Sequence, residues 1–274
     1  MSSTTLFLVP TPIGNLRDIT LRALEVLKQV DIIACEDTRH TRKLLSAYEI
    51  RKPLVSYERF SEMKKTEFII DALESGKNVA LVSDAGTPLI SDPGSALISR
   101  VRERGIRVEA LPGPSAVITA LAASGFGGGF RFIGFFPRQK SAAERETIKM
   151  ALTPEHTVFY ESPQRIIATL KLLERHLKDR AVCLAREISK IHEEYLLGHA
   201  GDLIEKLKDK EHIGEVTVIV KGSSQEDSLD DDTVRERAAA LIRAGHTKKD
   251  VLRALSEETG VGRNKIYDIL LRLE

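Results

Sequence analysis

Residues 79–94 decide the fold, and they read Val79-Ala80-Leu81-Val82-Ser83-Asp84-Ala85-Gly86-Thr87-Pro88-Leu89-Ile90-Ser91-Asp92-Pro93-Gly94. The first four residues are apolar and predict a buried strand, after which small, polar and turn-forming residues take over. Gly86 lets the backbone pass close to a ligand, and the two prolines fix the path of the chain. Ser83, Asp84 and Thr87 stand at the carboxyl end of the strand, where open α/β sheets bind their ligands. The length of the loop and its two aspartates favour a binding loop over a plain connection.

The same alternation of strand and helix continues on both sides of this stretch. Apolar runs predict strands at residues 5–10, 31–35, 53–57, 79–82 and 106–111, with amphipathic helices between them. One helix is expected to begin at Thr20, whose hydroxyl suits an N-cap. This alternation predicts a mostly parallel sheet with right-handed crossovers.

Four glycines within residues 125–129 predict a linker between two α/β domains, residues 1–125 and 126–222. Strands of the second domain are expected near residues 131–136, 157–161, 181–186, 194–198 and 215–221. Two of these strands, Ala181–Arg186 and Glu194–Gly198, have no helix between them. They therefore predict a hairpin and a mixed sheet.

The chain is expected to end in a small helical extension, residues 233–274, after an acidic linker at 222–232. Its apolar spacing predicts three short helices, one of them capped by Thr247. The extension has three more basic than acidic residues and resembles a helix-turn-helix, which would contact nucleic acid. A small structural or dimerising cap explains the same residues equally well.

Composition narrows the class of protein. The 274 residues hold 41 Lys and Arg against 40 Asp and Glu, so any contact with nucleic acid must come from local patches. The only two cysteines, Cys35 and Cys183, are far apart in sequence, which argues against a disulfide framework or a metal site and fits a reducing cytoplasm. No apolar run approaches the length of a membrane span, and residues 1–5 lack the basic flank of a signal peptide.

Four loops of the first domain follow strands and should meet at one edge of its sheet: residues 10–16, 36–42, 83–94 and 112–116. Neither a P-loop nor a G-x-G-x-x-G sequence is present, so a nucleoside triphosphate or a dinucleotide is disfavoured. The loops hold more carboxylates than bases. S-adenosylmethionine, which has a cationic centre, hydroxyls and an amino group, suits such loops, although the residues alone do not demand it.

These loops resemble those of one protein family. Residues 10–20 (Pro10-Thr11-Pro12-Ile13-Gly14-Asn15-Leu16-Arg17-Asp18-Ile19-Thr20) are similar to the first loop of the tetrapyrrole-methylase-like superfamily. Residues 36–39, 83–94, 112–116, 159–163 and 186–194 resemble one branch of it, the small-subunit ribosomal RNA methyltransferase I family. Porphyrinogen-methylating relatives have an acidic residue where Asn15 stands, which argues against a tetrapyrrole substrate.

The resemblance implies an enzyme with two α/β domains, S-adenosylmethionine in the cleft between them, and a homodimer. It implies 2′-O-methylation of a cytidine in the decoding region of 16S rRNA. Two other functions stay open: methylation of a tetrapyrrole or another small molecule, and a non-enzymatic regulator that binds nucleic acid. Carried over by position, the cofactor-binding residues are Pro12, Ile13, Gly14, Ser83, Asp84, Gly86, Thr87, Ile90, Ser115, Ala116, Tyr160, Glu161, Leu197 and Gly198.

The acceptor side of the site is predicted from the residue types at the same rim. Asp37 and Glu36 are the candidate catalytic bases, although carboxylates at the start of a helix are also favoured by its dipole. The cations that could hold RNA phosphates are Arg17, Arg39, Arg42, Lys43, Lys190, Lys248, Lys249 and Arg253.

Overall fold

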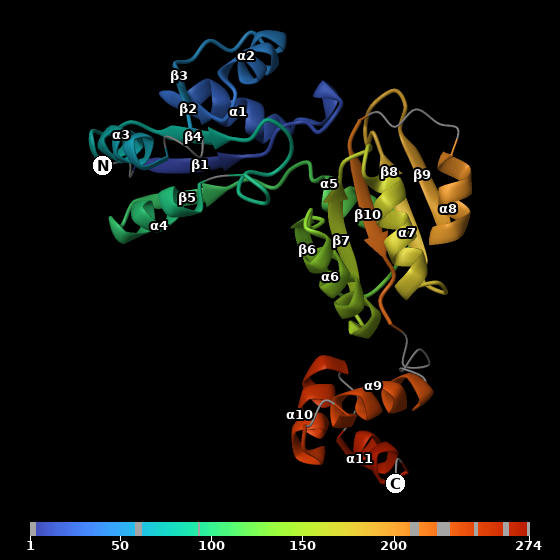
Figure 1. Ribbon diagram of the computed structural model, residues 1–274. Coiled ribbons are helices and arrows are strands. Elements are labelled where there is room, and N and C mark those ends of the chain that lie inside the picture. The colour runs from blue at the N-terminus through green and yellow to red at the C-terminus, as the bar shows by residue number, and fades with distance from the viewer. Residues whose placement is uncertain are drawn as a thin grey trace. The chain divides into compact units, whose positions relative to one another are not determined.

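The computed structural model describes residues 4–57, 62–92, 94–208, 214–223, 231–243, 246–259 and 263–272 (Figure 1). By its contacts the chain divides into two compact units. One comprises Met1–Thr119 with Glu187–Glu193, and the other comprises Ala120–Arg186 with Glu194–Glu274. The predicted boundary at residue 125 lies six residues beyond this division, and the sequence did not indicate that residues 187–193 join the first unit.

The first unit contains a five-stranded sheet. Its strands are β1 (Thr5–Val9), β2 (Ile32–Cys35), β3 (Leu54–Ser56), β4 (Val79–Val82) and β5 (Arg107–Ala110). They lie in the order β3-β2-β4-β1-β5, and every neighbouring pair is parallel. The predicted parallel sheet is therefore confirmed.

Helices cover both faces of this sheet, which explains why its central strands are apolar throughout. These helices are α1 (Leu21–Gln29), α2 (Thr38–Ala47), α3 (Glu62–Glu74) and α4 (Ser95–Glu103), with a short 3₁₀ turn, η1 (Leu16–Asp18), whereas α5 (Ala116–Ser124) spans the division between the two units. Alternate residues of β4 serve different cores: Val79 and Leu81 pack with α3 and α4, whereas Ala80 and Val82 pack with α1 and α2. The Thr20 hydroxyl accepts a hydrogen bond from the Ala23 N–H at 3.0 Å, as predicted for a cap of α1.

The strand order creates a switch point between β1 and β4. These strands are neighbours, but the helix that follows β1 lies on one face of the sheet and the helix that follows β4 lies on the other. The chain therefore leaves the two carboxyl ends in opposite directions, and open α/β sheets bind ligands in the crevice that results.

The second unit contains a mixed sheet. Its strands are β6 (Phe130–Phe135), β7 (His156–Glu161), β8 (Ala181–Arg186), β9 (Glu194–His199) and β10 (Val216–Val220), in the order β6-β7-β10-β8-β9. Only β6 and β7 are parallel, and β8 and β9 form the predicted antiparallel hairpin. Three helices, α6 (Lys140–Leu152), α7 (Ile166–His176) and α8 (Ala200–Leu207), bury their apolar faces against one side of this sheet (Figure 1).

The C-terminal residues form three helices, as predicted: α9 (Asp231–Arg243), α10 (Lys248–Thr259) and α11 (Arg263–Leu271). They share a small core of their own, made by Val234, Ala238, Val251, Leu255, Ile266, Ile269 and Leu270. The Thr247 hydroxyl accepts from the Asp250 N–H at 3.2 Å, so its predicted role as a cap is confirmed. In the part of the chain that the structure describes, no helix is long and apolar enough to cross a membrane.

Candidate functional site

Loops from β1 and β4 are joined directly at the switch point. The Thr11 and Gly86 backbones exchange two hydrogen bonds of 3.0 Å, forming an isolated antiparallel bridge. The Thr11 hydroxyl also donates to the Ser83 carbonyl at 2.9 Å, and the Ser83 hydroxyl donates to the Gly86 carbonyl at 2.9 Å. Gly86 has φ +82°, a conformation that favours glycine. These bonds give the crevice a fixed floor.

The other two predicted loops join the same rim. In the loop that follows β2, the Asp37 N–H donates to the Asp84 carboxylate at 3.1 Å. The Thr87 hydroxyl donates at 3.0 Å to the carbonyl of Pro114, which lies in the loop that follows β5. All four loops are thus linked through the β4 loop, as the sequence predicts.

A seven-residue strap, Glu187–Glu193, packs against the β1 loop. A Cβ at Gly14 would lie 2.7 Å from the Ile188 carbonyl oxygen and 2.6 Å from Lys190 Cγ, so only glycine allows this approach. The Ser189 hydroxyl also donates to the Asp18 carboxylate. Gly14, predicted to shape the cofactor site, therefore has a packing role that the sequence did not indicate.

A cavity of about 140 Å³ opens at this rim. Its lining comes from the β1 and β4 loops and from α2: Thr11, Pro12, Leu16, His40, Lys43, Leu44 and Asp84. Pro12 and Asp84 were predicted as cofactor residues and Lys43 as an RNA contact. His40 was missed, although it is the only histidine in the four loops. The cavity therefore brings a carboxylate, an imidazole and an ammonium group together.

A second depression, which we call the α2 depression, lies on the adjoining face of α2. It is wide and open, about 610 Å³, and is lined by Arg39, Arg42, Lys43, Ser46 and Ala47. Residues three and four apart share one face of a helix, so the spacing of the three cations places them together. Lys43 lines both hollows and connects the cavity to a positively charged surface.

Asp37 caps α2. Its carboxylate accepts from the Arg39 N–H at 2.7 Å and pairs with the Arg39 guanidinium at 3.3 Å. The backbone N–H of Arg39, and then its guanidinium, hold the pKa of the Asp37 carboxyl below its ordinary value. A lower pKa makes a carboxylate a weaker base, so this environment suits a cap better than a proton acceptor. Glu36, the other predicted base, is only partly exposed.

Neither cysteine is suited to nucleophilic chemistry. Cys35 ends β2 near the rim and Cys183 lies within β8, and both side chains are buried. Burial raises the pKa of the Cys35 thiol, and it raises that of Cys183 to about 11. Because the thiolate is the reactive form, both residues act as small core side chains.

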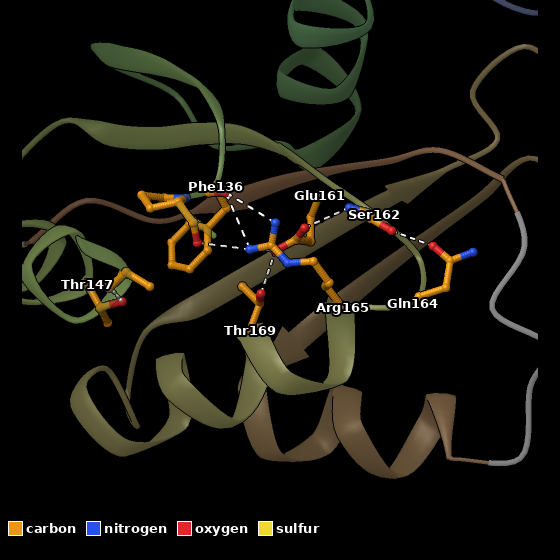
Figure 2. Close-up of polar contacts among 9 residues, drawn as sticks. Phe136, Thr147, Glu161, Ser162, Gln164, Arg165 and Thr169 are labelled. Atoms are coloured by element: carbon orange, nitrogen blue, oxygen red, sulfur yellow. Dashed lines mark hydrogen bonds and ion pairs between the residues drawn. The ribbon is translucent and has the colours of Figure 1, made fainter. Parts of the chain in front are cut away.

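The second unit holds Glu161 in a network of its own (Figure 2). Glu161 is buried, and its carboxylate accepts from the Ser162 N–H at 2.7 Å and from the Thr169 hydroxyl at 2.5 Å. Arg165 pairs with this carboxylate at 3.3 Å and also donates to the Pro137 carbonyl at 2.9 Å. The network fixes the start of α7 against β7, a role that the sequence did not indicate.

The register of the second sheet separates two predicted pairs of cofactor residues. Tyr160 lies opposite Thr217 on β10, whereas Leu197 and Gly198 lie on β9, three strands from β7. At about 4.8 Å per strand, β9 therefore lies roughly 14 Å from β7. The pairs do not adjoin one another in the sheet.

The remaining predicted residues lie in several places. Ser115 and Ala116 end the β5 loop and are partly exposed, and Ile90 is half-exposed in the β4 loop. The strap residue Lys190 is paired with Glu187 at 2.9 Å. Arg17 is exposed in η1. The last three cations, Lys248, Lys249 and Arg253, are exposed on α10.

Comparison with known proteins agrees with this architecture. The chain matches the family profile described as "Tetrapyrrole (Corrin/Porphyrin) Methylases" over residues 5–204. A solved structure of uroporphyrin-III C-methyl transferase from Thermus thermophilus, complexed with S-adenyl homocysteine, superposes with a TM-score of 0.55. It is 16% identical and covers 78% of this chain and 96% of its own.

Two curated relatives share much more of the sequence, and both are named "Ribosomal RNA small subunit methyltransferase I". The Bacillus subtilis protein is 40% identical, with 96% of this chain and 92% of its own length aligned. The Thermotoga maritima protein is 45% identical, with 79% of this chain but 98% of its own length aligned. A fifth of this chain thus has no counterpart in the Thermotoga protein.

The fold and the loops at the switch point define a methyltransferase of the tetrapyrrole methylase class. Within that class, the chain belongs to the ribosomal RNA small subunit methyltransferase I family, with which it shares about 40% of its residues over nearly its whole length.

Proposed function

We propose that this enzyme methylates the ribose 2′-oxygen of a cytidine in the decoding region of 16S rRNA. One observation of the site supports an RNA acceptor above all: Lys43 lines both the switch-point cavity and the α2 depression. A polyanion held by Arg39, Arg42 and Lys43 would present a nucleotide to the adjoining cavity. Asn15, in a position where a porphyrinogen-methylating relative is expected to have an acid, agrees with this choice of acceptor.

The methyl donor is S-adenosylmethionine, and the residues at the switch point fit it. The Asp84 carboxylate reaches the cavity, and a carboxylate is a suitable acceptor for ribose hydroxyls or an amino group. A Cβ at Gly86 would lie 3.3 Å from Ile13 Cγ2, so the β4 loop approaches another of the residues proposed for the cofactor closely. The donor supplies an activated methyl group and its own leaving group.

The remaining residues proposed for the cofactor are Pro12, Ile13, Gly14, Ser83, Thr87, Ile90, Ser115 and Ala116 in the first unit. Tyr160, Glu161, Leu197 and Gly198 in the second unit stay predictions.

The task of this chain is chiefly alignment, because a bound donor and acceptor held in line need little further catalysis. Rigid loops, joined by backbone hydrogen bonds, suit that task.

Proton removal from the acceptor hydroxyl is the second task. The sequence suggests Asp37 and Glu36 as candidate bases. His40 is a further candidate because it lines the cavity. Imidazole is the side chain that most often serves as a base in enzymes. We therefore favour His40 over Asp37, whose carboxylate caps α2.

The Asp37→Asn variant tests whether Asp37 acts as the cap of α2 or as the catalytic base. Asparagine caps a helix as well as aspartate does, so the melting temperature is expected to stay unchanged and kcat to fall less than about threefold. His40→Ala is expected to lower kcat by about 10²-fold. Steady-state kinetics and thermal denaturation of both variants check this. A fall of about 10²-fold in Asp37→Asn with unchanged melting would make the Asp37 carboxylate the base instead.

The substrate is tested by offering three acceptors with radiolabelled S-adenosylmethionine: unmethylated small ribosomal subunits, deproteinised 16S rRNA and a porphyrinogen. Label in ribose 2′-oxygens of either RNA supports the proposal and shows which state of the RNA is the substrate. Transfer to the porphyrinogen alone would overturn the acceptor and leave the donor in place.

The C-terminal helices are proposed to add RNA affinity through Lys248, Lys249 and Arg253. Deleting residues 233–274 is expected to weaken RNA binding and to reduce the slope of log affinity against log salt, because fewer phosphates are neutralised. Titration of labelled RNA at several salt concentrations measures both quantities. Unchanged affinity and slope would make the extension a structural cap.

The resemblance also supports a homodimer as the assembly, and the proposed substrate supports the cytoplasm as the location. Sedimentation equilibrium tests the first of these proposals.

A further inference from the structure

β6 contains a bulge that changes which face its side chains occupy. The pairing of β6 with β7 shifts in register between Phe132 and Phe135, and Gly134, inside the bulge, has φ +70°. In a regular strand, residues three apart point to opposite faces. Here the extra residue puts Phe132 and Phe135 on the same face, while Ile133 and Phe136 both pack into the core under the helices.

Three aromatic rings lie together as a result. Phe132 contacts Tyr160 edge to face, with ring centroids 5.0 Å apart, and Phe135 contacts the same ring edge to face at 5.4 Å. Phe135 is nevertheless 66% exposed. It stands on an edge strand, where exposed apolar groups are a liability unless they have a use. The bulge thus presents an aromatic ring to an external partner.

Charge identifies the kind of partner. Arg138 and Lys140 follow Phe135 closely and are exposed, and within the described part of the chain neither forms an ion pair. At most about 10 Å of chain separates Phe135 from Arg138. The first acidic residue after Phe135 is Glu144, whose carboxylate is engaged with Arg175 and His176. An aromatic ring beside unpaired cations suits a ligand with flat apolar groups on an anionic backbone.

We infer that Phe135 is a stacking platform for an unpaired base of the RNA substrate, with Arg138 and Lys140 holding the neighbouring phosphates. This inference rests on the proposed RNA methyltransferase function and adds a positioning residue to it. Tyr160 supports the platform by holding the Phe135 ring edge-on, which leaves a face of the Phe135 ring for the base. Phe135 itself takes no part in the transfer of the methyl group.

Phe135→Trp provides a direct probe, because the chain contains no tryptophan. We expect the emission of this single tryptophan to be quenched by an unmodified RNA fragment of the decoding region. Heparin, which is anionic but has no bases, is expected not to quench it. Phe68→Trp, at a half-exposed phenylalanine of α3, is the matched control and should not respond to the RNA.

The affinity of Phe135 variants for RNA distinguishes stacking on a base from simple apolar packing. Phe135→Leu keeps an apolar side chain without an aromatic face, and we expect it to bind the RNA fragment about tenfold more weakly, with KM raised more than kcat is lowered. Phe135→Tyr is expected to bind like the wild type, and both variants should bind S-adenosyl homocysteine normally.

Three results would overturn the inference while leaving the proposed function intact. Quenching of Phe135→Trp by S-adenosyl homocysteine alone would assign the ring to the cofactor. Emission that changes with protein concentration alone would assign it to an interface between copies of the chain. If Phe135→Leu binds RNA as tightly as the wild type does, the Phe135 ring makes no contact that contributes to RNA binding. If the wild-type protein binds neither this RNA fragment nor small ribosomal subunits, the proposed function fails together with the inference.

Discussion

Gly222→Ala is expected to destabilise the protein by about 3 kcal/mol, the upper range for overpacking a filled core. Gly222 is the second residue after β10 and is buried against the loop between α6 and β7. A Cβ at this position would lie 1.9 Å from the Pro154 carbonyl oxygen and 2.8 Å from the Glu155 carbonyl carbon. Both atoms belong to the backbone, so a change of side-chain rotamer cannot relieve the clash. The segment after β10 and the loop between α6 and β7 would have to move apart.

Separating them would break a set of hydrogen bonds. The Gly222 N–H donates to His156 Nδ1 at 2.9 Å, and the Ser223 N–H donates to the Thr153 carbonyl at 2.9 Å. The other ring nitrogen, His156 Nε2, is 2.9 Å from the Gly127 carbonyl oxygen. These contacts hold the end of β10 to the start of β7, so their loss affects the central strands of the second sheet.

Thermal denaturation measures the effect, and a loss of this size should lower the melting temperature by roughly 6–12 °C. The matched control is Gly127→Ala, where no atom lies within 4 Å of the added Cβ and φ is not positive. That variant is expected to stay within about 0.5 kcal/mol of the wild type. A Gly222→Ala protein that melts like the control would show that this close approach is absent.

Asp84→Asn is expected to weaken the binding of S-adenosyl homocysteine by about 10²-fold and to lower kcat/KM at least as much. The amide oxygen of asparagine can still accept the hydrogen bond that the Asp37 N–H now donates to Asp84 at 3.1 Å. The loops of the rim therefore keep their connection, and the main change is the loss of a negative charge that lines the cavity. The melting temperature is expected to change little.

Asp31→Asn is the matched control for this prediction. Asp31 immediately precedes β2, at the opposite edge of the same sheet, and its carboxylate likewise accepts one backbone N–H, from Asn78 at 2.8 Å. Calorimetric titration of both variants with S-adenosyl homocysteine is the measurement. If Asp84→Asn binds the ligand as tightly as Asp31→Asn does, Asp84 does not contact the cofactor.

Much of the fold follows from the local pattern. Val79–Val82 is apolar at every position because helices cover both faces of β4, and this is the signature of a parallel sheet. The hairpin of β8 and β9 was recognisable because nothing helical separates the two strands. Thr20 and Thr247 were recognisable as caps because a cap acts on backbone groups only three residues away.

The meeting of the four loops was also predictable, because the carboxyl ends of parallel strands share one edge. The environment of each side chain there was not. Whether Asp37 is a base or a cap depends on the Arg39 N–H and guanidinium, and sequence alone leaves both roles open. His40 gained significance only because α2 directs it into the cavity with Asp84.

The sequence by itself determined the order of the elements, the parallel and mixed character of the two sheets, and the loops that form the rim. These depend on periodicity and on contacts between near neighbours. Only the tertiary structure decided that residues 187–193 join the first unit, that Gly14 and Gly222 admit no side chain, and that a bulge turns Phe135 outward. The physical reason is that each of these depends on atoms from segments far apart in the sequence, or on strand register, and neither leaves a local pattern.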